Sequence, residues 1–416
     1  MWTKMTRTTL GAFLGFALCL IWPSATMFKK APTLLFLYVG FALVVLWLFT
    51  QWLLPHVERY CANPKVAIPV LTAMFLALTV AFFVIYPQID TAGFQLFGRQ
   101  FGACDCDNAI DQSMARILAG KYPYYDTTTK SYIVTFCDGH ITSMPGAILL
   151  ASPFYFLGCS AFQGIFWRAV FILGMGMYFR GTLIPLLVAM FTFFLSPIFV
   201  YDIFTGADYH TNATYVLIFS ALLYESVNRK CHFGLSALWA ALLGIGLSSR
   251  MNFMFVAPVL YLALVRMAGF RKGTLLMTFA GVAWCALTLP FYLYAPTHFT
   301  PFHTASKLGR MPLWATILSL ALAILLTTYF ALRHLKREST LLHLFRDIFW
   351  IQLYFIAVNT LATSIYNYTS YRMITFAFWD SGFGVFFAFF GFVAFAPTLF
   401  APRSRGSIAP STQAVS

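Results

Sequence analysis

The sequence predicts an all-α polytopic membrane protein with about twelve transmembrane helices. Three observations predict this class: the composition, the apolar runs and the placement of charge. Of the 416 residues, 60% are hydrophobic and 19% aromatic, whereas only 10% are charged. A soluble chain is roughly 45–50% apolar and about 25% charged, so this chain has too few charges to cover a soluble surface. The composition also excludes disordered, collagen-like and disulfide-scaffold proteins.

Apolar runs long enough to cross a bilayer recur along the chain, since a span needs about 20 residues. They lie near 8–28, 32–54, 66–86, 143–162, 182–201, 207–227, 233–249, 251–269, 273–294, 312–332, 347–367 and 375–400. The stretch 163–180 is interrupted by Gln163, Arg168 and Arg180, so we expect an interfacial or re-entrant helix there. Residues 1–402 are expected to form one domain, and 403–416 a disordered tail.

The net charge of +14 is not a nucleic-acid signature in such a chain, because Lys and Arg near span ends set orientation. With an inside N-terminus, most basic residues fall in cytoplasmic connections. This predicts a multi-pass protein of a bacterial inner or plasma membrane with both termini in the cytoplasm. Most acidic residues fall instead in two neighbouring outer connections, at Asp90, Asp105, Asp107, Asp111, Asp126, Asp138, Asp202 and Asp208.

The long outer loop 87–142 is the predicted catalytic segment. After Asp107, apolar residues at 110, 114, 117 and 118 follow helical spacing, and Gly120 with Pro123 forms a stop signal. Asp107 suits the N-cap of this helix. The pattern predicts a short amphipathic helix on the membrane surface with carboxylates at its start.

The same segments resemble a known family. The loop reads Asp105-Cys106-Asp107, then Ala115-Arg116-Ile117-Leu118, then Gly120-Lys121-Tyr122-Pro123-Tyr124, with Pro145 at the mouth of the next run. Further on come Gly206-Ala207-Asp208-Tyr209-His210-Thr211-Asn212 and Gly244-Ile245-Gly246-Leu247-Ser248-Ser249-Arg250. Over roughly 100–270 this order is similar to the GT-C superfamily of membrane glycosyltransferases, particularly its mannosyltransferase-like branches.

The resemblance implies transfer of a sugar, a mannose or another hexose or pentose, from a polyprenyl-phosphate donor. The acceptor would be a hydroxyl of a glycolipid, polysaccharide or protein at the outer face, and the transfer would be inverting. The chemistry is consistent with this, because a phosphate leaves readily and only the acceptor hydroxyl must lose a proton. One carboxylate therefore suffices as general base. Asp107 is the first candidate, Asp105 the second, and Asp111 is placed near the acceptor.

The donor phosphate needs a cation at the outer boundary. Arg250 lies between two apolar runs there, where an ionisable residue is costly and is a functional candidate by default. Lys307 and Arg310 are second choices in the outer loop 297–310. The sugar or acceptor would be lined by Asp208, Tyr209, His210, Asn212 and Tyr124.

Cysteines in the catalytic loop leave two readings open. In an oxidising outer loop, Cys137 is expected to pair with Cys104 or Cys106. A Cys-x-Cys with a distant Cys-Asp-x-His is not a standard zinc spacing. We therefore expect no cofactor, although a divalent cation at Asp105 and Asp107 stays open.

The competing function is transport: a multi-span carrier or flippase of a lipid-linked or small polar solute. It predicts acidic residues inside spans and an internal repeat. Away from the ends of the predicted spans only Asp380 is acidic, because Asp208, Glu225 and Asp347 lie at or within two residues of a span end, and no repeat is visible. The acids lie in loops, as an outward-facing enzyme would place them.

Overall fold

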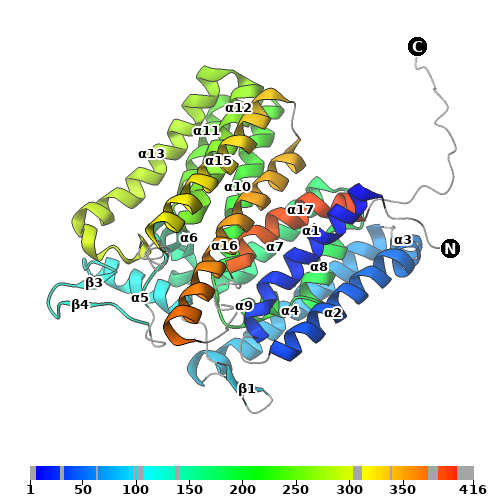
Figure 1. Cartoon of the computed structure of the whole chain (residues 1–416), viewed down its shortest axis with the longest axis horizontal. Helices are drawn as coiled ribbons and strands as arrows, with labels where there is room; N and C mark the ends of the chain where they lie inside the picture. Colours follow the sequence, from blue (N-terminus) through cyan, green and yellow to red (C-terminus); the bar gives the residue numbers. More distant parts are fainter. Residues whose placement is uncertain are drawn as a thin grey trace.

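The protein is a helical bundle with a small subdomain, which contains α5 and two hairpins, at one end (Figure 1). The structure, a computed structural model, describes residues 6–28, 32–61, 64–92, 94–96, 99–101, 106–135, 140–302, 312–337, 340–372 and 383–400. The helices are α1 (Arg7–Ser24), α2 (Pro32–Leu48), α3 (Leu54–Cys61), α4 (Pro64–Ala92), α5 (Cys106–Leu118), α6 (Pro145–Phe156), α7 (Phe162–Tyr178), α8 (Ile184–Phe194), α9 (Pro197–Phe204), α10 (Tyr209–Asn228), α11 (Phe233–Leu247), α12 (Val256–Ala268), α13 (Phe270–Tyr294), α15 (Leu313–Lys336), α16 (Leu341–Tyr371) and α17 (Val385–Leu399).

The predicted class, an all-α protein with several membrane-spanning helices, is confirmed. Seven of the described helices are long and apolar enough to cross a membrane: α1, α2, α4, α12 with the turn before it, α13, α15 and α16. A bent pair, α8 and α9, would make an eighth, although the two helices meet at 79°. The count of twelve is not confirmed. Three of the predicted spans are short helices of 12 to 15 residues, α6, α11 and α17.

The stretches 143–162 and 163–180 contain α6 and α7, and neither is among the helices long and apolar enough to cross a membrane. Both ends of α6 lie beside the residues that later form the candidate site: Gly146 N donates to Ser248 O at 2.8 Å, and the Cys159 Sγ is 3.1 Å from the Tyr86 Oη. A 12-residue helix spans about 18 Å, so α6 lies across one end of the bundle without crossing it. We call this the site end.

Helix α7, expected at the interface, instead runs along α10 through the body. Its Gly164 carbonyl oxygen lies 3.4 Å from His210 Nε2 at the start of α10, and Tyr178 lines a cavity together with Glu225 near the other end of α10. Arg168, in the middle of α7, is buried and interacts electrostatically with Asp202.

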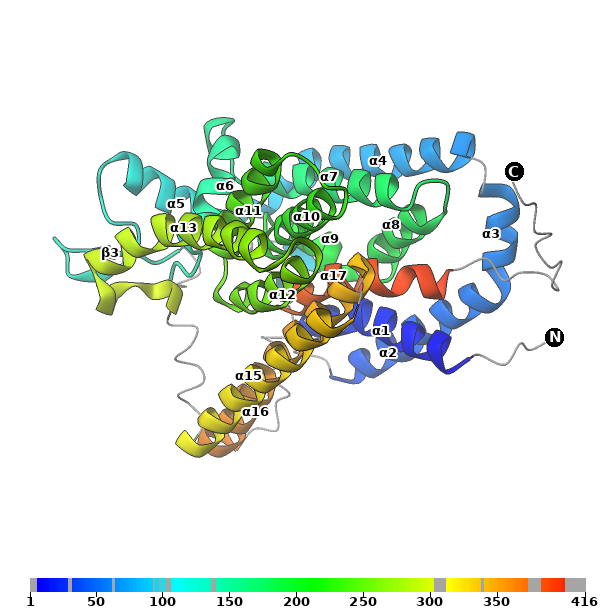
Figure 2. The same ribbon diagram turned by 90° about the horizontal axis from the view of Figure 1, so that it is seen from above.

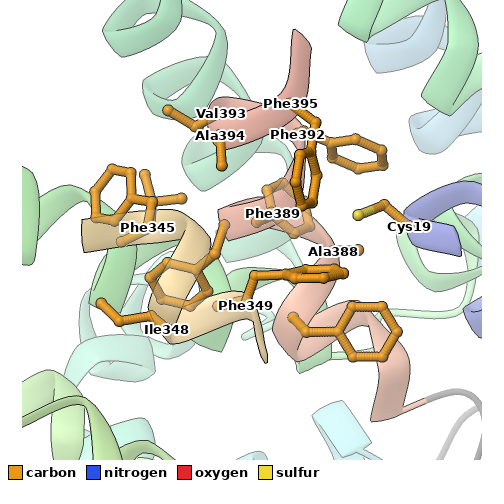
Figure 3. Packing of buried hydrophobic residues seen from close by; sticks show 14 of the residues in the cluster. Cys19, Phe345, Ile348, Phe349, Ala388, Phe389, Phe392, Val393, Ala394 and Phe395 are labelled. Atoms are coloured by element: carbon orange, nitrogen blue, oxygen red, sulfur yellow. The ribbon is translucent and has the colours of Figure 1, made fainter. Parts of the chain in front are cut away.

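Helix α17 forms the centre of the hydrophobic core. Almost all of its residues are buried, as expected of a helix that is apolar on every side. It packs against α1, α16 and α10 (Figure 3), and Phe389 meets Phe171 with ring centroids 4.8 Å apart. A Cβ on Gly391 would lie 2.8 Å from the Phe349 ring, so this glycine permits the close approach of α16.

Helices α1 and α17 run antiparallel, which places the start of α1 and the end of α17 at the same end of the bundle. Gly15 in α1 packs on Phe395 near the end of α17. Gly384, directly before α17, packs on Trp22 near the end of α1. Figure 2 shows the two helices side by side, beneath the layer that holds α7, α10 and α11. This arrangement agrees with termini on one side. The cytoplasmic assignment remains a prediction.

The outer loop contains the predicted helix and two hairpins that were not predicted. The sequence predicts Asp107 as the N-cap of α5. In the structure α5 starts at Cys106, so Asp107 lies in its first turn instead. Its end is as predicted: Gly120 has φ +67°, and Lys121 N donates to Arg116 O at 2.8 Å, a Schellman motif. The hairpins pair β1 (Phe94–Leu96) with β2 (Arg99–Phe101), and β3 (Tyr125–Asp126) with β4 (Ser131–Tyr132).

The fold gives a direct test of sidedness. A cysteine introduced at Thr128, an exposed residue of the β3–β4 turn, should react with a membrane-impermeant maleimide in intact cells. The native Cys231, in the connection between α10 and α11 at the opposite end, should react only after permeabilisation. Labelling of Thr128→Cys from the cytoplasmic side alone would overturn the orientation.

Candidate functional site

The candidate site forms where the ends of α4, α5 and α10 meet the turn before α7 and the break between α11 and α12. Tyr86, Asp107, Ser160, Asp208 and Arg250 come from these five places. No two of them are neighbours in sequence. The fold alone brings them to one end of the bundle.

Asp107 is a buried carboxylate held from two sides. Its side chain is 2% exposed. The Tyr86 Oη donates to Oδ2 at 2.5 Å, and the backbone N–H of Asn108 donates to Oδ1 at 2.9 Å. The N-terminus of α5 also favours a negative charge at this position.

Gly206 brings the Asp107 carboxylate against the backbone of the turn between α9 and α10. This glycine has φ +68°, a conformation that other L-residues adopt at a cost. A Cβ there would lie 2.5 Å from Asp107 Oδ2 and 3.0 Å from the Cβ of Ala161. Only glycine therefore allows the carboxylate to pack on this turn.

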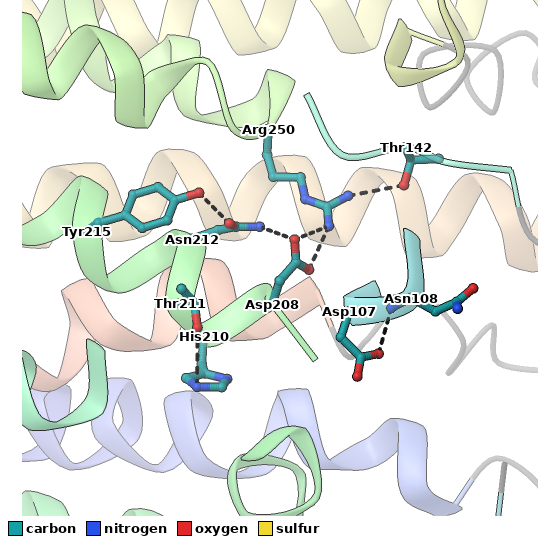
Figure 4. A network of polar contacts seen from close by, with 9 residues as sticks. All are labelled: Asp107, Asn108, Thr142, Asp208, His210, Thr211, Asn212, Tyr215 and Arg250. Carbon is teal, nitrogen blue, oxygen red and sulfur yellow. Dashed lines mark hydrogen bonds and ion pairs between the residues drawn. The ribbon is translucent and has the colours of Figure 1, made fainter. Parts of the chain in front are cut away.

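Two residues further on, Asp208 forms a buried ion pair with Arg250 (Figure 4). The Nη2 of Arg250 lies 2.7 Å and 2.9 Å from the two carboxylate oxygens, and its Nη1 donates to Thr142 Oγ1 at 3.1 Å. Asp208 is fully buried and also accepts from Asn212 Nδ2 at 3.0 Å. Tyr215 in turn donates to the Asn212 side-chain oxygen.

Backbone contacts between α6 and α11 set the position of Arg250. Met144 N donates to Ser249 O at 3.3 Å, directly after the helix that ends at Leu247. Gly146 has no room for a side chain, because a Cβ would lie 2.2 Å from the Ile245 carbonyl oxygen. The segment before α6 is thus fixed against the end of α11, which places Thr142 beside the guanidinium.

The remaining predicted ligand residues do not all converge. The guanidinium carbon of Arg250 lies over the Tyr209 ring, 5.4 Å from the ring centroid. Tyr209 therefore belongs to the same cluster. His210 is fully buried and faces Gly164 of α7, away from Arg250 in Figure 4. Tyr124 is also fully buried and donates to Ser143 O at 3.0 Å within a separate apolar cluster. Asp111 Oδ1 accepts from Ser160 N at 3.3 Å.

Several predicted residues lie outside the described part of the chain: Asp105, Cys104, Cys137, Lys307 and Arg310, together with the side chain of Cys106. The disulfide therefore remains a prediction. Among the described residues, no group of three His, Cys, Asp or Glu side chains is arranged to hold a metal ion.

Two further buried ionisable side chains, Arg168 and Asp202, were not predicted as a functional unit; they interact electrostatically but form no direct ion pair in the described part of the chain. Arg168 is 6% exposed and its guanidinium lies 5.6 Å from the Phe199 ring and 5.7 Å from the Phe389 ring. Asp202 is 2% exposed and interacts electrostatically with Arg168 and with Asp208. The signal was present in the sequence: an arginine breaks one apolar run, and an aspartate ends another.

Polar atoms around this pair lack partners among the described residues: Arg168 Nε, Asp202 Oδ2, His210 Nδ1 and Gln163 Nε2. Arg168 also lines a cavity of about 30 Å³ between α4, α7 and α9. Such a volume holds about one water molecule, which could satisfy some of these groups.

No family model matches this chain, and neither a curated protein nor a solved structure is significantly similar to it. The fold and site therefore define the class on their own terms: an integral membrane protein with a buried carboxylate and an adjacent buried ion pair at one end of its helical bundle.

Replacing Gly206 by alanine should remove Asp107 from its position. Gly181 is the matched control, because it also has a positive φ of +79° but has open space around its Cβ position. Both variants should lose about 1 kcal/mol from backbone strain. Gly206→Ala should lose on the order of 1 kcal/mol more, because the carboxylate must also move. Equal thermal unfolding of the two purified variants would contradict the packing described for Asp107.

Breaking the Arg168–Asp202 pair should destabilise the protein strongly. Arg168→Met leaves a buried carboxylate uncompensated, and such losses cost about 3–5 kcal/mol. Adding Asp202→Asn should recover part of this loss, giving a coupling energy on the order of 1–3 kcal/mol in a double-mutant cycle. Additive effects would show that the two side chains do not act as a pair.

Proposed function

We propose that the protein is a membrane glycosyltransferase that moves a sugar from a polyprenyl-phosphate donor to an acceptor hydroxyl at the outer face of the membrane. Asp107 acts as general base, and Arg250 binds the donor phosphate. The sugar is a mannose or another hexose or pentose, and the acceptor is a glycolipid, polysaccharide or protein. The lipid bilayer supplies the donor.

The observation that carries the proposal is the environment of Asp107. A carboxylate that served only to start α5 would be exposed to solvent, whereas this one is buried and held by Tyr86 and by the Asn108 amide. Such fixation is what a general base requires, because its oxygen must meet the acceptor proton within hydrogen-bond distance. The Asp107 carboxylate packs on Gly206, and Asp208 of the Asp208–Arg250 pair follows Gly206 by two residues.

The proposed reaction needs few groups. The acceptor oxygen attacks the sugar carbon while Asp107 takes the hydroxyl proton, and the bond from that carbon to the phosphate oxygen breaks. The phosphate leaves with the bonding electrons and needs no strong acid. Attack from the face opposite the phosphate inverts the sugar carbon. Arg250, held by Asp208 and Thr142, stabilises the charge on the leaving phosphate.

A transporter is the second candidate, and the Arg168–Asp202 pair is the observation that favours it. Charges inside a helical body mark solute or proton pathways in carriers. Arg168 belongs to α7 and Asp202 to α9, and Asp202 also interacts electrostatically with Asp208. Solute uptake into proteoliposomes without any transfer product would favour this alternative.

Substitution of the base tests the proposal. Asp107→Asn keeps the size of the side chain but cannot accept a proton, so turnover should fall by about 10²- to 10⁴-fold. Asp111→Asn, one helical turn on, should weaken acceptor use more modestly. Glu225→Gln is the matched control at the opposite end of the bundle, where the carboxylate pairs with Arg229. The measurement is transfer of radiolabelled mannose from polyprenyl-phosphate mannose to lipid extract, with thermal unfolding as folding control. Near-normal transfer by Asp107→Asn would exclude this mechanism.

Substitution of Arg250 tests the donor site. Arg250→Lys retains a point charge and should keep part of the donor affinity, whereas Arg250→Ala should lose most of it. Both variants leave Asp208 without its normal partner, so Asp208→Asn combined with Arg250→Ala controls for the unpaired carboxylate. Donor binding is measured by equilibrium titration in detergent. Equal affinity in wild type and all variants would remove Arg250 from the donor site.

A further inference from the structure

A shallow groove lies beside α5, between that helix and the β3–β4 hairpin, and its lining combines polar side chains with the apolar Ala115, Ile133 and Val134. It has a volume of about 430 Å³ and opens to the outside of the protein. Gln112 and Arg116 line it from the helix, and Asp126, Thr129, Ser131 and Tyr132 from the hairpin. None of these side chains takes part in the proposed chemistry. The volume lies in the range of small-molecule sites.

The lining suits a neutral ligand with many hydroxyl groups. Arg116 and Asp126 form an ion pair at 3.4 Å, so their charges compensate each other. The amides of Thr128 and Thr129 also bond Asp126 Oδ1, and together these contacts hold the pKa of that carboxyl below its usual range. A phosphate or carboxylate ligand would therefore find no net positive charge. Hydroxyl groups, which both donate and accept, match the amide of Gln112 and the hydroxyls of Thr129 and Ser131.

One wall of the groove is aromatic and held in place. The Tyr132 ring contacts Tyr125 at 5.4 Å, His140 at 5.0 Å and His298 at 5.6 Å between centroids. Tyr125 and His298 stack at 3.8 Å, which ties the hairpin to the end of α13. A fixed tyrosine offers an apolar ring face and a polar tip. A sugar ring has the complementary combination of an apolar C–H face and hydroxyl edges.

A row of polar side chains connects the groove with Asp107. Gln112 Nε2 donates to the side-chain oxygen Oδ1 of Asn108 at 2.7 Å. The backbone N–H of Asn108 donates to Asp107 Oδ1. Asn108, Gln112 and Arg116 are spaced four apart, so they lie on one face of α5. The nine helical steps from Asp107 to Arg116 cover about 13 Å. Asp107 itself lies on the buried face of α5, so a saccharide in the groove reaches it only by extending past Asn108 at the start of the helix.

We propose that this groove binds a neutral oligosaccharide, and that this saccharide is the acceptor of the transfer. The second part rests on the proposed function, whereas saccharide binding does not. Among the acceptor classes, a glycan chain on a lipid or polysaccharide is thereby preferred to a hydroxyl of a folded protein. The groove determines which acceptor is used, and Asp107 acts on its terminal hydroxyl.

The test measures binding without any donor. Full-length protein in lipid nanodiscs is titrated with linear α-mannotriose, maltotriose and xylotriose, and binding is followed by saturation-transfer NMR. Wild type should bind at least one of these saccharides. Gln112→Ala and Ser131→Ala should each weaken that affinity by about 3- to 10-fold, since each removes a hydrogen-bonding group. Thr128→Ala is the matched control on the same hairpin, because its exposed side chain does not line the groove.

Turnover separates this inference from the proposed function. With the bound saccharide as acceptor, Gln112→Ala should raise its KM by about the same factor while kcat and the donor KM stay within about twofold. If saccharide binding weakens in the variants but no sugar is transferred, the groove stands and the proposed function fails. If transfer occurs but the acceptor KM is unchanged in both variants, the function stands and the groove assignment is wrong. Absence of saccharide binding to wild type, or binding only of a serine- and threonine-containing decapeptide, overturns the inference.

Discussion

The ion pair between Asp208 and Arg250 is the interaction on which the geometry of the site depends. It joins the start of α10 to the break between α11 and α12, and through Thr142 it reaches the segment before α6. Each charge would cost several kcal/mol to bury alone, so neither side chain is tolerable there without the other. Because Asp208 is fully buried and Arg250 nearly so, the pair acts as a fixed point. Gly206 and Asp107 take their positions from it.

Short helices make this fixed point accessible from one end of the bundle. Helix α6 lies across that end, and α9 turns away from α8 at 79°. A full-length span in either place would carry its polar ends to opposite sides of the body. Instead, the turns at 157–161 and 205–208 both meet α5, where Ser160 Oγ donates to the Asp107 backbone oxygen at 3.2 Å. The short lengths thus concentrate polar termini at one location, and a polar site in an apolar protein needs such a concentration.

Much of this arrangement follows from the sequence, and the exceptions have physical causes. Long uninterrupted runs such as α13 and α15 were predicted closely because length and hydropathy suffice for them. The burial of Arg168 in α7 was not predicted, because hydropathy counts an arginine as exposed and its electrostatic partner Asp202 lies on another helix. Tyr86 was missed because it ends an apolar run, where nothing marks its hydroxyl as a partner of Asp107. Asp107, Asp208 and Arg250 were identified, but their mutual positions depend on tertiary contacts.

The register of α5 links the two halves of the site. Asp107, Ile110 and Met114 are buried on one face, whereas Gln112 and Ala115 lie toward the groove. A shift of one residue would turn every side chain by about 100°, removing the carboxylate from Tyr86 and the glutamine from the groove together. The Schellman motif at Gly120 prevents such a shift, because the helix must end there for Tyr122 and Tyr124 to pack against α13. The end of one short helix therefore fixes both Asp107, the proposed base, and the surface beside it.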